Sequence, residues 1–219
     1  MNRPRIAAAD LGIAIAIALY ILLLALLPLV LPQPVFRHAF SEQGPFERLA
    51  IAAWIMTALV IIVRIRPLGP RAWAFALLCM IFAAREADWH KAFTADSILK
   101  TNYYKHAIAP FGEKLAAASV ALAAITLLLY VGFVVARFLL RDGGWRSRSG
   151  IWLLAGTTLV VLGKILDRAP AVLALNYGIV LPPILGLYAA AYEEGLEMIH
   201  PLLLCWSVWI SQNERRYLS

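Results

Sequence analysis

Long apolar stretches separated by short polar segments dominate the chain. Six stretches are close to 20 residues long or longer, and they comprise residues 10–31, 47–65, 71–90, 113–139, 150–167 and 184–211. A helix of about 20 residues crosses the roughly 30 Å hydrocarbon core of a bilayer. Lipid offers no hydrogen-bond partners, so a spanning backbone must satisfy its own polar groups, and none of the six stretches alternates as a barrel strand would. The pattern predicts an all-α polytopic bundle of six spans, with residues 1–219 forming one transmembrane domain.

Two connections are too long to be simple turns. Residues 91–112 mix aromatic and lysine side chains, which is typical of the headgroup layer, and we expect them to form an outer loop that lies on the membrane or covers a site beneath it. Residues 169–186 are apolar but are interrupted by Gly178 and by Pro182-Pro183. We interpret them as a re-entrant or interfacial segment. A seventh span there would leave only about eleven residues after His200, too few to cross again.

Composition agrees with lipid as the main solvent of the chain. Hydrophobic residues make up 62% of it and the mean hydropathy is +0.76. The net charge of +7 comes from basic residues at the ends of apolar stretches, so it indicates topology and not a nucleic-acid partner. The first apolar stretch is too long for a signal peptide and no small-x-small site follows it, so we expect an uncleaved span. Cys79 and Cys205 both lie in apolar stretches, where buried, inert thiols are expected.

Arginine placement predicts the orientation of the bundle. With six spans, eleven arginines fall on one side: Arg3, Arg5, Arg64, Arg66, Arg71, Arg137, Arg141, Arg146, Arg148, Arg215 and Arg216. The positive-inside rule makes this side cytoplasmic and places both termini there.

The spans carry ionisable residues almost only in their outer halves. Counting from the cytoplasmic ends at about 1.5 Å per residue, Glu47 and Glu86 lie more than 20 Å up their helices. Asp167 and the last stretch follow the same pattern, the latter with Glu193, Glu194, Glu197 and His200. Carboxylates in a membrane normally face the bundle interior and need partners. The sequence therefore predicts a polar cluster near the outer interface.

Two histidines suggest metal chemistry at this cluster. Glu193, Glu197 and His200 fall within an arc of about 60° on the last helix. Glu197-x-x-His200 has the spacing that di-iron carboxylate bundles use to direct two ligands inward. Glu86 and His90 are four residues apart, which would place them on one face of the third helix. Glu86, His90, Glu197 and His200 are thus candidate ligands for a divalent Zn, Fe or Mn ion.

Two other interpretations stay open. Arg48, Arg85, Lys164 and Arg168 occur at the same depth and would neutralise much of the acid, giving an ion-paired network that holds the helices together. A proton-coupled transporter would also use carboxylates and histidines, but the inner halves of the spans contain no matching polar path.

The chain contains four short polar motifs: Glu42-x-Gly44-x-x-Glu47, Arg85-Glu86-Ala87-Asp88-Trp89-His90, Lys164-x-x-Asp167 and Glu193-Glu194-x-x-Glu197. Their arrangement resembles that of a group of bacterial multi-span inner-membrane proteins of uncharacterised function. The resemblance covers most of the chain and implies a bacterial inner-membrane location but no activity. The chain is similar only loosely to ceramidase-like intramembrane hydrolases, because it lacks their Ser-x-x-x-His and His-x-x-x-His signatures.

Together these features lead to one functional hypothesis and its main rival. We expect a metal-dependent membrane enzyme that acts on a lipid-like substrate. In it, Glu193, Glu194, Asp167 and Glu47 would serve as general acids or bases, or support the ligands. The rival is a non-enzymatic subunit or assembly factor with an ion-paired core.

Overall fold

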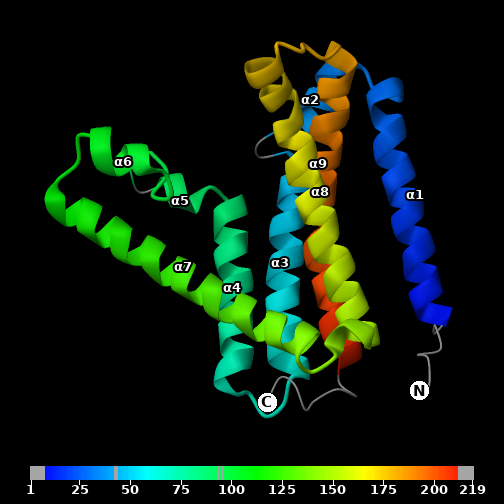
Figure 1. Ribbon diagram of the computed structural model, residues 1–219, viewed down its shortest axis with the longest axis vertical. Helices are drawn as coiled ribbons and strands as arrows, with labels where there is room; N and C mark the ends of the chain where they lie inside the picture. Colours follow the sequence, from blue (N-terminus) through cyan, green and yellow to red (C-terminus); the bar gives the residue numbers. More distant parts are fainter. Residues whose placement is uncertain (1–7, 42–43, 93, 95, 212–219) are drawn as a thin grey trace.

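The protein is a bundle of long helices, seen in a computed structural model that describes residues 8–41, 44–92, 94 and 96–211 (Figure 1). No β-strand occurs among these residues. The helices are α1 (Ala8–Val30), α2 (Gln33–Ala39), α3 (Pro45–Arg64), α4 (Pro70–Glu86), α5 (Trp89–Ala92), α6 (Thr101–His106), α7 (Phe111–Leu140), the 3₁₀ turn η1 (Gly144–Arg146), α8 (Arg148–Tyr177) and α9 (Pro183–Ile210). Arg3, Arg5, Glu42, Arg215 and Arg216 lie outside the described residues.

Local signals explain several of the helix ends. Pro45, Pro70 and Pro183 each occupy the first turn of a helix, where a missing N–H removes no helical hydrogen bond. Helix α8 begins after Ser147, whose hydroxyl accepts a hydrogen bond from the backbone N–H of Gly150 at 3.0 Å. The helix ends at Gly178, which has a φ of 66°, a conformation that glycine adopts without strain.

Within the part of the chain that the structure describes, four helices are long and apolar enough to cross a membrane, namely α1, α3, α7 and α8. Helix α4 is shorter, with 17 residues, and α9 contains three glutamates. Many large apolar side chains of α1 and α7 are exposed, among them Leu19, Leu29, Leu122 and Leu129. An apolar outer surface of this kind suits contact with lipid, so the protein has the construction of a membrane protein.

Helix α9 occupies the centre of the bundle. It packs against α8, α3 and α1, and α4 covers the other side of α3 (Figure 1). The α8–α9 contact is close because Gly156 lies against Leu203 and Gly163 lies against Leu196. Helix α7 runs obliquely away from this core and packs against α4 and η1 (Figure 1).

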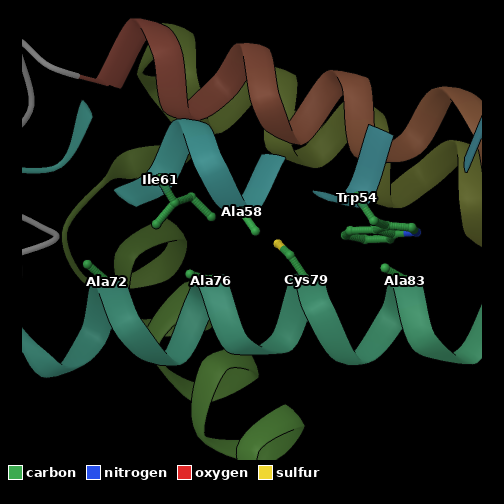
Figure 2. Packing of buried hydrophobic residues seen from close by; sticks show 7 residues of the cluster. All are labelled: Trp54, Ala58, Ile61, Ala72, Ala76, Cys79 and Ala83. Atoms are coloured by element: carbon green, nitrogen blue, oxygen red, sulfur yellow. The ribbon is translucent and has the colours of Figure 1, made fainter. Parts of the chain in front are cut away.

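The α3–α4 contact shows how small residues bring two helices together. Ala72, Ala76, Cys79 and Ala83 recur every three or four residues along one face of α4, and they meet Trp54, Ala58 and Ile61 of α3 (Figure 2). Short side chains on one helix leave room for the large ones on the other, which gives dense packing without a polar driving force. Both helices are therefore held side by side over most of their length.

Two sequence predictions about helix limits are corrected. The predicted span 71–90 is not one helix, because α4 ends at Glu86 and Asp88 has a φ of 57°. The predicted span 150–167 is too short, because residues 169–177, the first half of the segment expected to be re-entrant or interfacial, continue α8 through Pro170 to Tyr177. Their alanine- and leucine-rich sequence favours helix, and the chain turns only at Gly178.

A proline also interrupts the hydrogen bonding of α9. Pro201 is almost completely buried, and its backbone carbonyl accepts a hydrogen bond from the Thr57 hydroxyl of α3 at 2.8 Å. The same hydroxyl donates to the carbonyl of Ala53 at 2.8 Å. A fully buried threonine thus ties α3 to the part of α9 where the helical ladder lacks one N–H.

Candidate functional site

The structure brings five glutamates and one lysine together at the end of the bundle where α3 begins and α4 ends. We call this group the carboxylate cluster, and it comprises Glu47, Glu86, Glu193, Glu194, Glu197 and Lys164. All six side chains are half-buried. The three glutamates of α9 lie around its middle, and the lysine lies just past the middle of α8. Since these two helices are antiparallel neighbours, these polar segments meet.

Lys164 makes two ion pairs across the α8–α9 contact. Its Nζ lies 3.0 Å from Glu193 Oε1 and donates a hydrogen bond to it. It also pairs with Oε1 of Glu197, one helical turn further along the same face of α9. One cation therefore holds two carboxylates on the neighbouring helix, beside the close glycine–leucine contact at Gly163.

Glu86 and Glu194 lie close to this set without such a partner. The carboxylate of Glu194 is close enough to be repelled by four others, those of Glu197, Glu193, Glu47 and Glu86. The carboxylate of Glu86 is repelled by that of Glu197, and attraction to Arg85 and Lys164 offsets this repulsion. Within the described residues, neither Glu86 nor Glu194 takes part in an ion pair or side-chain hydrogen bond. The cluster thus has more carboxylates than direct basic partners.

The remaining predicted site residues are distributed around the cluster. Asp167 lies at its edge, where its carboxylate is 3.5 Å from Nε of the exposed Arg168. His200 packs its ring against Trp54, with the ring centroids 5.3 Å apart, and it lies beside Gly156. The position that His200 takes is therefore deeper in the bundle, between α3 and α8.

His90 belongs to a different local environment from Glu86. Because the chain leaves the helix after Glu86, the predicted shared face of these two residues does not form. The Nδ1 atom of His90 instead lies 4.0 Å from a carboxylate oxygen of Asp88, which also pairs with Lys91 at 2.8 Å. Among the described residues, no three His, Cys, Asp or Glu side chains are placed to hold a metal ion together.

A second polar site, which the sequence pattern does not predict, lies near the start of α1. The carboxylate of Asp10 accepts hydrogen bonds from Arg148 Nε at 2.7 Å, Trp152 Nε1 at 3.1 Å and Trp206 Nε1 at 3.4 Å. These donors come from α8 and α9, so one buried acid joins three helices. The sequence contains one indication of this site, because Asp10 is a lone acid at the start of an apolar stretch and such an acid needs a partner. Trp152 and Trp206 are also typical of an interfacial aromatic belt, so the sequence alone does not indicate that they bind Asp10.

The connection between α5 and α7, which the sequence predicts to be an outer loop, is also held by polar contacts. Tyr103 is completely buried, and its hydroxyl donates a hydrogen bond to Glu113 Oε1 at 2.7 Å. This bond to a carboxylate raises the pKa of Tyr103 to about 12, so the hydroxyl stays protonated at neutral pH. The contact fixes α6 against the first turn of α7.

No protein-family model, curated protein or solved structure matches the chain. The arrangement of its own residues is therefore the basis for any functional proposal.

Proposed function

We propose that the protein is a six-span protein of the bacterial inner membrane, with both termini in the cytoplasm and the carboxylate cluster in the outer half. Helices α4 and α9 would be the two spans in addition to α1, α3, α7 and α8. The close packing of α4 along α3, and of α9 along α8 and α3, supports this assignment. Arg64 and Arg71 at one end of α3 and α4, opposite the cluster, fit a cytoplasmic side.

Within this framework we infer that the cluster is primarily an ion-paired network that fixes the bundle, as in a non-enzymatic subunit or assembly factor. The observation that carries the proposal is the double ion pair of Lys164 with Glu193 and Glu197. A charge in a low-dielectric environment is tolerated when it is paired, and removal of one partner leaves the other uncompensated. Lys164 would therefore set the register of α8 against α9.

A double-mutant cycle tests this role. We expect Lys164→Met and Glu197→Gln each to lower the free energy of unfolding, the lysine substitution by about 2 kcal/mol because Lys164 is partly exposed. The double variant should lose less than the sum of the two, with a coupling energy of about 1 kcal/mol. Unfolding of the purified protein in mixed micelles measures all three. Arg141→Met is the control, because Arg141 is exposed just after α7 and makes no ion pair within the described residues. Strictly additive effects would contradict the network.

A second candidate is the metal-dependent membrane enzyme with a lipid-like substrate. It is favoured by Glu86 and Glu194, two carboxylates beside Glu197 that have no direct basic partner among the described residues. In this candidate Glu86, His90, Glu197 and His200 bind Zn, Fe or Mn, which would supply a Lewis acid or an activated water. Binding would require His90 and His200 to approach the glutamates.

Metal analysis of the purified protein tests this candidate. This candidate predicts about one Zn, Fe or Mn ion per chain, and its loss in a Glu86→Gln/Glu197→Gln variant, because the ion would lose carboxylate ligands. Glu113→Gln is the matched control, because it is the same type of substitution outside the carboxylate cluster, and this variant should retain the metal. An absence of metal from all three proteins would rule the candidate out and leave the ion-paired network unaffected.

A further inference from the structure

The outer loop forms a preformed unit at the end of α7. We define the loop module as residues 88–92, 94 and 96–114, which include α5, α6 and the first turn of α7 (Figure 1). Besides the Tyr103–Glu113 contact, the Tyr104 hydroxyl donates to the carbonyl of Ile98 at 2.6 Å. Lys114 Nζ donates to the carbonyl of Tyr104 at 3.2 Å. Polar contacts thus hold the module in shape without any partner.

The surface of this module is unusually apolar for a connection between helices. The side chain of Ile108 is fully exposed, and those of Phe111, Trp89 and Leu99 are at least half exposed. Phe111 opens α7, and the exposed apolar surface continues along that helix through Leu115 and Val120. The apolar part of the module is therefore continuous with a helix surface that faces lipid in a membrane.

Basic side chains flank the apolar ones. Lys105 is exposed and has no ion pair or hydrogen bond among the described residues, and it lies three residues before Ile108. The side chain of Lys100 is 63% exposed, and its Nζ forms an ion pair with Asp96 Oδ1 at 3.6 Å on the surface. Lysines beside exposed apolar and aromatic residues are the combination that suits the boundary between headgroups and acyl chains.

We propose that the loop module is a docking surface for the headgroup layer of the adjacent leaflet, with a preference for anionic phospholipid. Ile108 and Phe111 enter the acyl boundary, while Lys100 and Lys105 meet lipid phosphates. Continuity with α7 supplies the apolar side of this interface, and the two lysines supply the complementary charge. Docking would hold α7 in its oblique position, a role separate from that of the carboxylate cluster.

Site-directed fluorescence on the whole chain tests the depth of the module. In a Cys79→Ala/Cys205→Ala background, Ile108→Cys, Val120→Cys and Asp142→Cys are each labelled with nitrobenzoxadiazole and reconstituted into vesicles that contain phosphatidylglycerol. Val120 lies on the exposed face of α7, and Asp142 lies in the exposed loop after it. We expect the label at position 108 to resist iodide and to be quenched by spin-labelled lipid, as at position 120. Iodide quenching equal to that at position 142 would overturn the proposal.

The lipid preference is tested with charge variants. Each lysine near an anionic surface changes the docking equilibrium about fivefold, so Lys100→Gln/Lys105→Gln should increase iodide access to position 108 in these vesicles. Arg141→Gln, at the opposite end of α7, is the control and should not change it. In vesicles of phosphatidylcholine alone, the lysine variant and the parent chain should behave alike. Equal iodide access in the two vesicle types for the parent chain would contradict the preference for anionic lipid.

Discussion

An Asp10→Ala variant is expected to lose about 3 kcal/mol of unfolding free energy, because the substitution removes the only carboxylate that joins α1, α8 and α9 at this end of the bundle in the described residues. The Asp10 side chain is 9% exposed. The substitution removes the acceptor of one guanidinium and two indole hydrogen bonds, and a buried donor that loses its acceptor is costly. Arg148 reaches the surface in part, which keeps the loss below that of a fully buried pair.

Two substitutions separate the contact from a general effect of removing charge. Asp10→Asn keeps one acceptor oxygen and should lose about 1 kcal/mol. Asp142→Ala removes an exposed aspartate and should stay within about 0.5 kcal/mol of the parent chain. Unfolding in mixed micelles gives the three values. If Asp10→Ala behaves like Asp142→Ala, the three-helix contact does not stabilise the protein.

A Gly195→Ala variant is expected to lose about 2 kcal/mol by overpacking the contact between α1 and α9. A Cβ atom at this position would clash with Leu24 Cδ1 and would lie 2.6 Å from Leu24 Cδ2. Leu24 is completely buried, so it has little room to move. The carbonyl of Gly195 also accepts a hydrogen bond from the Tyr20 hydroxyl at 2.9 Å, and this bond weakens if α1 is displaced.

The same substitution elsewhere in α9 provides the control. A Cβ atom added to Gly186 would meet no atom of the described residues within 4 Å, so Gly186→Ala should stabilise α9 by up to about 1 kcal/mol through helix propensity alone. Leu24→Ala shortens the opposing side chain and should remove the clash. Leu24→Ala should therefore cost less unfolding free energy in the Gly195→Ala protein than in the parent chain. A stabilised Gly195→Ala variant would show that α1 does not pack against α9 in this way.

Most of the long helices could be predicted because apolar length is a local property of the sequence. The stretches 10–31, 47–65 and 113–139 coincide closely with α1, α3 and α7. The proximity of glutamates from α3, α4 and α9 is expected from their positions along the helices. In a bundle of parallel and antiparallel helices, residues at the same distance from one end of the bundle lie in the same layer. The sequence marks Lys164 as a neutralising charge, and its pairing with two glutamates of α9 fits that interpretation.

Other features depend on contacts that a sequence pattern does not contain. The helix break after Glu86 depends on the left-handed conformation of Asp88. The four-residue spacing of Glu86 and His90 predicts a shared face only if the helix continues, and the spacing does not indicate a break. Helix α8 continues through Pro170 because proline removes one hydrogen bond without ending a long apolar helix. The acceptor role of Asp10 requires Trp152 and Trp206 to meet across two helices, which only the packing of α8 on α9 determines.

The ion pairs of Lys164 also have a consequence for how the chain enters the bilayer. Charged residues oppose insertion by up to about 3 kcal/mol each at the centre of a span, and less toward the interface. Helix α9 carries three glutamates, so its transfer as a separate segment is opposed by its own charges. Helix α8 precedes it directly and brings the cation that pairs with two of them. In the six-span arrangement proposed above, the unit that favours the lipid phase is therefore the α8–α9 hairpin, in which both partners of each ion pair enter the membrane together.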